Sequence, residues 1–373
     1  MNKSRIAVIG TGGCGNKLLD TLLNIDNRYV PLFCNTNIKE MEILDNYNKD
    51  TNALYIAGAA GSGRDSKVAK ELILKDKARV GDYLKNRFSE SSGINTFFIL
   101  ASGDGGSGSG SVSLLTQIIK KSVNRDAKIN LLIAAPKLSE KELSFANFKR
   151  LWNDIAKLID ANMLNSVQFI DNNKMYDEEE FNYEVMKEFN DSLSINSIEI
   201  DEKDSERVNT APGYKVTLSI DSKYKPLKMA VDNAIKDSNF ILPEHLECDY
   251  MLSYLDGDVF DNSKLDRLFT VYGMTKSDYH SVEDEPNILV LGGCEMPVHY
   301  IELIEEAELN LKIQKEERNK NRAKMVAVSI DEDDNIKTKD KSEEMSSKPK
   351  KGKKRKMSDR EFLNRLNEMD DLW

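Results

Sequence analysis

The sequence predicts an α/β protein: a doubly wound parallel sheet, a central helix, a second, smaller α/β domain, a long C-terminal helix and a disordered basic tail. Up to about residue 175, short apolar runs alternate with helical stretches. Strands that alternate with helices of this length pair in parallel through right-handed crossovers. The apolar runs have few polar interruptions, which is typical of a sheet covered on both faces. Beyond residue 297 the chain becomes strongly charged.

The elements follow from the positions of these runs. Strands of the first region are expected at 5–9, 30–34, 53–57, 96–101, 129–135 and 167–170. Helices are expected at about 13–25, 38–46, 65–90, 110–123, 141–164 and 178–199. From about residue 214, the second domain is expected to contain strands at 214–220, 248–255 and 287–292 and helices near 226–237 and 262–272.

The C-terminal part has three sections. A long helix is expected from Pro297 to roughly Met325; only its first part has an apolar face, so we expect it to project from the body or to pack on a neighbouring molecule. Residues 329–357 are polar and lack periodicity, which predicts disorder, and seven of the nine residues 348–356 are basic. Residues 358–373 are expected to form a short amphipathic helix, a common docking element on a flexible tether.

Composition narrows the class of protein. The chain has 373 residues and a net charge of −10, which argues against a surface coated for nucleic acid. Its four cysteines show no CxxC spacing, and with only three histidines a His-based catalytic or metal site is not expected. No apolar run has the length of a membrane span and no signal peptide is recognised. A cytoplasmic protein is therefore expected.

Two glycine-rich loops follow predicted strands. The first, Gly10-Thr-Gly-Gly-Cys-Gly-Asn16, leads into the helix at 13–25. The second, residues 102–111, reads Ser-Gly-Asp-Gly-Gly-Ser-Gly-Ser-Gly-Ser and precedes another helix. Glycines let the backbone approach a ligand, and free N–H groups at a helix N-terminus bind anions. Both loops therefore predict phosphate binding.

Two common nucleotide sites fit this pattern poorly. A dinucleotide-binding oxidoreductase needs an acidic residue after the second strand, where this chain has Asn35-Thr36-Asn37, and it has no use for a second glycine loop. A P-loop needs a lysine where Asn16 stands. Nicotinamide binding would nevertheless establish the oxidoreductase alternative.

Two glycine loops with Asn-Thr-Asn between them resemble the tubulin/FtsZ superfamily of GTPases. The resemblance implies GTP or GDP as ligand, with Mg²⁺. Asp104 stands where the family signature has its first glycine, and the loop at 61–64 is similar to the family loop that meets the γ-phosphate. The nucleotide-binding residues implied here are Gly12, Gly13, Cys14, Gly15, Asn16, Asn37, Gly61, Gly63, Arg64, Gly103, Asp104, Gly105, Gly106, Ser107 and Gly108.

The same resemblance implies contacts to the ribose and the base. Glu140 is placed like the ribose-contacting glutamate, although Ser144 stands where an arginine is expected. Asn172 matches the residue that hydrogen-bonds the guanine edge. A second guanine contact falls on Asn182 or Asn190; Asn182 is preferred because a helix starting there is long enough to cross the domain.

Catalysis in this superfamily is shared between subunits. Residues 200–205 resemble the FtsZ loop that one subunit inserts into the nucleotide pocket of the next, which implies catalytic roles for Asp201 and Asp204. The alternative is a solvated acidic turn. The resemblance thus implies a filament in which assembly activates GTP hydrolysis.

Within the superfamily, the long charged helix and the basic tail resemble the TubZ branch of plasmid and phage tubulins. That resemblance implies segregation of plasmid or prophage DNA through a small DNA-binding adaptor on a centromere, contacted by residues 348–373. The alternatives are a cell-division FtsZ or, for the basic run alone, a tail that only keeps filaments apart. A tail of seven positive charges favours a protein–DNA complex through counterion release.

The implied domains follow. They are a GTPase domain at 1–176, the central helix and catalytic loop at 177–205, a second α/β domain at 206–296, the C-terminal helix at 297–328, and the tail at 329–373.

Overall fold

The computed structural model describes residues 1–56, 61–89, 92–195, 200–256, 260, 270–272, 279–281 and 287–333; in 279–281 and 323–333 only the backbone is described. The chain divides into two units, residues 1–316 and 317–373. Among the described helices, none combines the length and the apolar character that crossing a bilayer requires.

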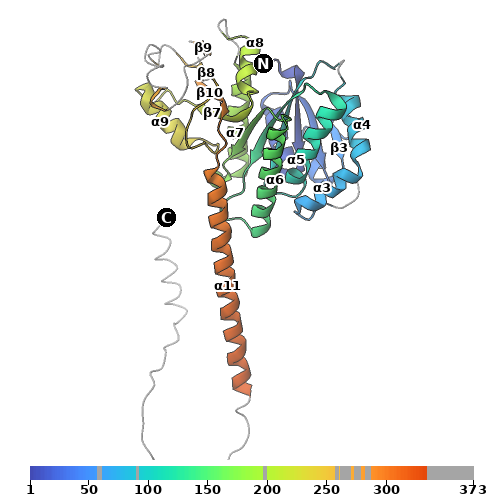
Figure 1. Ribbon diagram of the computed structural model, residues 1–373, viewed down its shortest axis with the longest axis vertical. Helices are drawn as coiled ribbons and strands as arrows, with labels where there is room; N and C mark the ends of the chain where they lie inside the picture. The colour runs from blue at the N-terminus through green and yellow to red at the C-terminus, as the bar shows by residue number, and fades with distance from the viewer. Residues whose placement is uncertain are drawn as a thin grey trace, which may run out of the picture. The chain divides into compact units, whose positions relative to one another are not determined.

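A ten-stranded sheet organises the first unit (Figure 1), in the order β3-β2-β1-β4-β5-β6-β7-β10-β8-β9. The strands are β1 Ile6–Thr11, β2 Val30–Asn35, β3 Ala53–Tyr55, β4 Thr96–Ser102, β5 Lys128–Ala134, β6 Ser166–Ile170, β7 Gly213–Ser219, β8 Tyr250–Tyr254, β9 Tyr279–Ser281 and β10 Ile288–Cys294. The first seven pair in parallel, whereas β10 is antiparallel to both β7 and β8. The predicted doubly wound parallel sheet is confirmed.

Strands of the second domain continue the same sheet. The junction between β6 and β7 is short, with Ser166 opposite Gly213 and Val167 opposite Tyr214. The tyrosine hydroxyl reinforces it, because Tyr214 accepts from the backbone N–H of Phe169 at 3.0 Å and donates to the carbonyl of Ile241 at 2.5 Å. One sheet therefore joins the two regions that the sequence separates.

The helices are α1 Gly12–Ile25, α2 Lys39–Glu42, α3 Ser66–Lys75, α4 Lys77–Arg87, α5 Ser107–Ile118, α6 Glu142–Asp160, α7 Glu178–Ser194, α8 Glu202–Asn209, α9 Leu227–Asp237 and α11 His299–Asp333. The single helix expected at 65–90 is divided at Asp76, whose non-helical backbone caps both α3 and α4. Helix α5 continues as a π-helical turn, Ile119–Val123, so the helix predicted at 110–123 ends where it was expected to end. Most of the helix expected near 262–272 lies outside the described residues.

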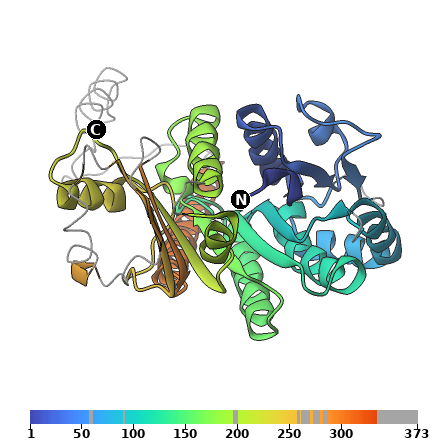
Figure 2. The same cartoon turned by 90° about the horizontal axis from the view of Figure 1, so that it is seen from above.

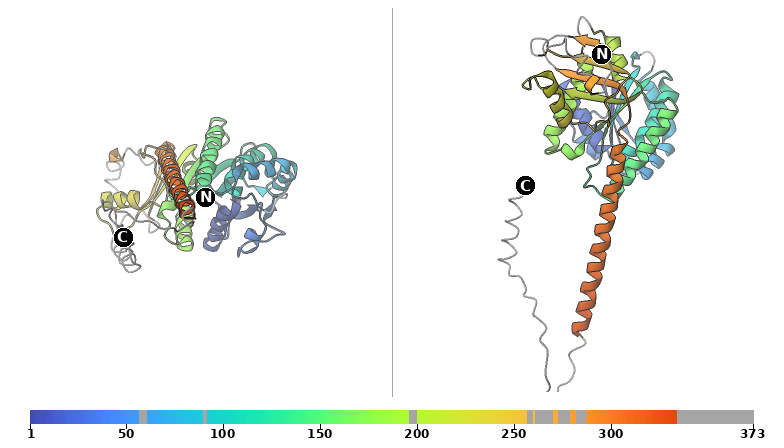
Figure 3. Two further views of the ribbon diagram at one scale, coloured as in Figure 1. Left: turned by 90° about the horizontal axis from the view of Figure 1, so that it is seen from below. Right: turned by 60° about the vertical axis from the view of Figure 1, so that its left-hand side comes forward.

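Both faces of the parallel strands are covered (Figure 3). Helices α3 to α6 pack on one face, in a core that includes Phe97, Leu115 and Phe148. Helices α1 and α7 pack together on the other, around Leu19, Phe98 and Phe189. From above, α7, in light green, lies between the N-terminal strands and the olive and orange elements of the second domain (Figure 2).

Helix α11 begins close to its predicted start but ends eight residues beyond the expected Met325, so its last residues enter the stretch predicted to be disordered. Its first turns pack on the first unit through buried Tyr300 and Ile304 and through ion pairs of Glu308 with Lys149 and of Lys315 with Glu142. The basic run at 348–356 and the helix expected at 358–373 lie outside the described residues.

Candidate nucleotide site

A pocket of about 560 Å³ lies at the C-terminal ends of the first four strands. Loops after β1, β2, β3 and β4 form most of its wall, and the first residue of α7 closes one side. The structure brings together these predicted residues in its lining: Gly12, Gly13, Cys14, Asn37, Gly61, Gly63, Arg64, Asp104, Gly105, Gly106, Ser107 and Gly108.

Two helix N-termini meet at this pocket. Helix α1 starts at Gly12, whose φ of +72° is readily available only to glycine. A Cβ at Gly12 would lie 2.7 Å from the backbone nitrogen of Gly108 in the first turn of α5, so the two helix starts touch. Neither start has a side-chain cap, which leaves backbone N–H groups for a ligand. The arrangement suits an anion.

Hydroxyl groups connect three of the loops. The Ser107 side-chain oxygen lies 2.7 Å from the Thr36 hydroxyl, after β2, and 3.3 Å from the Ser62 hydroxyl, after β3. Thr11, at the end of β1, pairs with Ser111 of α5 at 2.6 Å. Neither hydroxyl was predicted from the sequence to be part of the site: Ser62 was not among the predicted residues, and Thr36 was noted only as the middle residue of the Asn-Thr-Asn motif.

Charges in the pocket are mixed. Lys17 is paired with Glu178 at 2.7 Å, and the Asp104 carboxylate accepts a hydrogen bond from the Ser102 hydroxyl. Burial raises the pKa of the Cys14 thiol to about 12, helped by the negative charges of Asp104 and Glu178. Arg64 has no carboxylate partner within the described part of the chain. Its guanidinium is therefore free to meet an anionic ligand.

Three of the predicted residues lie behind the lining. A side chain at Gly15 would collide with the backbone of Leu100, so this glycine lets α1 pack on β4. Asn16 is buried and exchanges hydrogen bonds with the backbone of Cys34, at 3.2 Å and 3.3 Å. The N–H of Gly103 donates to Ala134 at 2.8 Å. These three residues hold the loops in position.

The residues expected to contact ribose and base follow later strands. Glu140 precedes α6 and accepts from Ser144 at 3.4 Å. Asn172 directly follows β6, Asn182 lies on α7 one turn after Glu178, and neither amide has a side-chain hydrogen bond within the described residues. The buried Asn190 amide instead accepts from Lys3 at 2.7 Å and from Tyr29 at 3.0 Å.

Asp201 and Asp204 lie at the start of α8, which is near the N-terminal ends of β1 and β4 and so at the other end of these strands from the pocket. Asp201 caps the helix by accepting from the N–H groups of Lys203 and Asp204, while Asp204 accepts from the N–H of Asp201 at 3.2 Å. These backbone hydrogen bonds, first among them that of Asp204, lower the pKa of Asp201. A cavity beside α8 is lined by Ile6 and Thr96, the first residues of β1 and β4.

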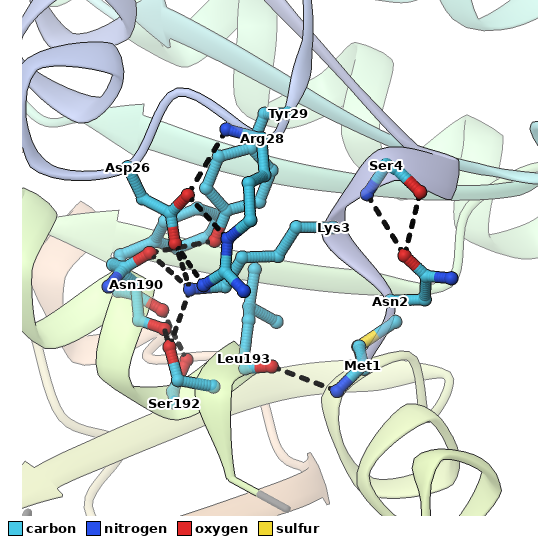
Figure 4. Close-up of polar contacts among 12 residues, drawn as sticks. Met1, Asn2, Lys3, Ser4, Asp26, Arg28, Tyr29, Asn190, Ser192 and Leu193 are labelled. Atoms are coloured by element: carbon cyan, nitrogen blue, oxygen red, sulfur yellow. Dashed lines mark hydrogen bonds and ion pairs between the residues drawn. The ribbon is translucent and has the colours of Figure 1, made fainter.

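A buried ionic network holds the N-terminus against the end of α7 (Figure 4). The Lys3 ammonium donates to Asp26 at 2.7 Å, to Asn190 at 2.7 Å and to Ser194 at 2.6 Å. Asp26 also accepts from Arg28, at 2.6 Å and 2.9 Å. No local motif in the sequence marks this network, because Lys3 and its α7 partners are about 190 residues apart.

Comparisons with known proteins agree with this arrangement. Residues 5–179 match the Tubulin/FtsZ family, GTPase domain. The tubulin-like protein TubZ of Clostridium botulinum C phage is 25% identical over 309 residues, which are 82% of each chain. The solved structure of tail-truncated TubZ from C. botulinum phage c-st superposes with a TM-score of 0.72 at 23% identity, over 84% of this chain and all of that one.

More distant structures share the fold. The GTPγS-form protofilament of TubZ from Bacillus thuringiensis serovar israelensis gives a TM-score of 0.69 at 20% identity, covering 86% of this chain and 94% of that one. CetZ from Methanosaeta thermophila gives 0.66 at 14% identity, with 88% and 97% covered. Residues 5–179 therefore form a GTPase domain of the tubulin/FtsZ family, and the chain that contains it is TubZ-like.

Proposed function

We propose that this GTPase polymerises head to tail with GTP, hydrolyses it at the contact between successive subunits, and so drives segregation of plasmid or prophage DNA. The observation that carries the proposal is the placement of the two halves of the site. The phosphate loops follow the C-terminal ends of β1 and β4, whereas α8 lies beside their first residues, Ile6 and Thr96. A six-residue strand such as β1 separates these ends by about 20 Å.

That separation prevents an acidic residue of α8 from reaching the pocket of its own chain. A second copy stacked in the same orientation would bring its Asp201 and Asp204 to this pocket. The pocket then holds the GTP, and the neighbour's carboxylates orient and deprotonate the water that attacks the γ-phosphorus. Loss of the γ-phosphate removes contacts from the shared site and weakens the subunit contact.

The two halves of the nucleotide are assigned to different strands. The N-terminal ends of α1 and α5, with Arg64, receive the phosphates. Asn172 and Asn182 offer amides to the guanine edge, since an amide both donates and accepts. The preference for Asn182 over Asn190 rests on the length of a helix that starts there, and the hydrogen bonds that occupy the Asn190 side chain support it. Glu140 stays assigned to the ribose.

Magnesium fits the oxygen-rich wall of the pocket. Mg²⁺ is usually held by substrate phosphates, water and one or two carboxylates, and Asp104 supplies a carboxylate in the lining. The bound ion would neutralise phosphate charge during transfer. The Ser102 hydroxyl donates a hydrogen bond to this carboxylate.

Relatives support the filament and the cargo. Solved structures include a TubZ two-stranded filament and a protein described as type III plasmid segregation TubZ. We assign the basic segment 348–373 to an adaptor bound on centromere DNA, because its clustered positive charges favour a protein–DNA complex. Deleting residues 348–373 tests this assignment: polymerisation should persist while recruitment to adaptor–DNA ends. Undiminished recruitment would place the partner site elsewhere.

The deciding experiment is light scattering with phosphate release over a protein titration, with GTP, ATP or NAD. We expect scattering with GTP alone and hydrolysis that rises steeply above a critical protein concentration. Turnover per molecule that is independent of concentration would contradict the shared site. A response to NAD instead of GTP would contradict the nucleotide assignment.

A further inference from the structure

The buried side chain of Asn147, on α6, bridges two pocket loops. Its amide nitrogen donates to the carbonyl of Arg64 at 2.7 Å and to the carbonyl of Asp104 at 2.8 Å. Its amide oxygen accepts from the N–H of Ser66 at 3.2 Å and from Arg150 at 2.9 Å. All four hydrogen-bonding positions of a fully buried amide are therefore used.

The two bridged loops also touch each other directly. A Cβ at Gly106 would lie 2.8 Å from the carbonyl carbon of Arg64 and 2.8 Å from the nitrogen of Asp65. Ser62 and Ser107 meet through their hydroxyls at 3.3 Å. The loop after β3 thus has little freedom to move against the loop after β4 while Asn147 holds both carbonyls.

Arg64 has a left-handed backbone conformation, which is unfavourable for an arginine. Its φ is +64°, one of two positive φ values at non-glycine residues in the described part of the chain. L-residues other than Asn and Asp rarely adopt this backbone conformation, so neighbouring contacts must maintain it. The hydrogen bond from Asn147 to the Arg64 carbonyl is such a contact, and it fixes the residue whose unpaired guanidinium lines the pocket.

Strand order indicates which phosphate this loop meets. In the proposed function the guanine lies near Asn172, after β6, and the phosphates lie at the loops after β1 and β4. Since the order is β3-β2-β1-β4-β5-β6, a nucleotide that starts at β6 and crosses β4 and β1 ends at the β3 side. The last phosphate is then the one nearest to residues 61–64.

We infer that Asn147 is a positioning residue for recognition of the γ-phosphate: by clamping the Arg64 and Asp104 carbonyls, it makes the pocket prefer a nucleoside triphosphate to the diphosphate. The inference rests on the proposed function, from which it takes the ligand. It assigns no catalytic contact to Asn147, which the loops separate from the pocket.

The test compares GTPγS with GDP. Binding of each to the full chain with Mg²⁺ is measured by calorimetry, at protein concentrations below assembly, for wild type and for Asn147→Asp. This substitution keeps the shape of the side chain but replaces both N–H donors with an oxygen that repels the two carbonyls. The matched control is Asn153→Asp, an exposed position on the same helix.

For Asn147→Asp we expect GTPγS affinity to fall by about tenfold and GDP affinity to fall by less than about threefold, the size of one or two hydrogen bonds. The control should change neither. If Asn147→Asp does not fold, Asn147→Ser, which adds no charge, should show the same selective loss to a smaller degree.

An equal loss of GTPγS and GDP affinity, or no loss, would overturn the inference and leave the proposed function in place. Wild-type protein that binds neither nucleotide would overturn the proposed function, and with it the inference. A GTPγS-selective loss in the control variant would also contradict the role of Asn147, because Asn153 is exposed and its side chain has no hydrogen bond to the loops among the described residues.

Discussion

The two ends of the parallel strands are stabilised in different ways. At the C-terminal end, backbone N–H groups and hydroxyls surround an open pocket of about 560 Å³, and the loops are held by hydrogen bonds to one another and to Asn147. At the N-terminal end, Lys3 is 4% exposed, and its ammonium makes three hydrogen bonds, one to Asp26 at the C-cap of α1 and two to residues of α7. At the C-terminal end, polar groups are available to a ligand, whereas at the N-terminal end the polar groups of the Lys3 network are already hydrogen-bonded to one another.

The difference suits a site divided between subunits. A pocket must admit and release its nucleotide, so its polar groups stay available. The acidic start of α8 enters another molecule's pocket in the proposed function, and its position depends on the end of α7, which Lys3 holds. Changes at the two ends should therefore have separable effects on binding, turnover and stability.

The largest effect is expected from removing negative charge at α8. Asp201→Asn and Asp204→Asn should each lower GTP turnover by about 100-fold or more, the usual contribution of a general base, while GTP binding and assembly persist. Asparagine is also a good N-cap, so Asp201→Asn leaves the helix start intact. Phosphate release and sedimentation measure the two properties.

Glu202→Gln is the matched control, since Glu202 lies in the same exposed turn but outside the capping pair. Unchanged hydrolysis in both aspartate variants would show that this turn is only a solvated cap.

At the opposite end, Gly106→Ala should weaken GTP binding by about tenfold, because the new methyl group would lie 2.8 Å from the backbone of Arg64 and Asp65 and push the loops apart. Gly106→Trp should abolish binding. Gly105→Ala is the control, because its Cβ would make only ordinary contacts with Ser102, at 3.5 Å and 3.7 Å. Equal losses in both alanine variants, read by calorimetry, would disprove the close approach of the two loops.

Lys3→Met should lower the free energy of unfolding by about 3 kcal/mol, because it leaves the mostly buried carboxylate of Asp26 without its buried partner. Nucleotide affinity should stay within about twofold of wild type, since the pocket is at the other end of the strands. Urea unfolding gives the stability. Lys187→Met, in an exposed ion pair on α7, should cost less than about 1 kcal/mol. A similar cost for both substitutions would mean that burial of Lys3 contributes nothing.

The smallest effect is a change in acid sensitivity. Hydrogen bonds from Arg28, and then from Lys3, hold the pKa of Asp26 well below its ordinary 3.8. The folded state thus binds fewer protons than the unfolded state, and the stabilisation present above pH 4 is lost as the pH falls below 3.8. Asp26→Asn should flatten this acid limb in urea unfolding between pH 5 and pH 2.5. An unchanged slope would assign acid sensitivity to other carboxylates.

Sequence reasoning located the sheet and the glycine-rich loops that line the pocket, because both depend on local patterns. Buried parallel strands appear as apolar runs, and phosphate loops appear as clustered glycines. The division of one predicted helix at Asp76 was missed, because the residues on both sides favour helix equally.

Longer-range contacts could not be predicted. Asn147 reaches Arg64 and Asp104 across 83 and 43 residues, and nothing around Asn147 distinguishes it from an exposed helix position. The Lys3 network is hidden for the same reason. In each case the tertiary fold determines which residues lie within hydrogen-bonding distance, and these residues belong to no common sequence motif.

Because the pocket and the acidic turn lie at opposite ends of the strands, their placement also sets how many complete active sites a filament, or row of stacked copies, contains. Under the proposed function, each site needs a pocket from one copy and an acidic turn from the next, so a row always has one complete site fewer than it has copies. The copy at one tip keeps a pocket that nothing completes. The GTP bound there is hydrolysed later than the GTP at every complete site. The hydrolysis state of the bound nucleotide therefore distinguishes the two ends of the row.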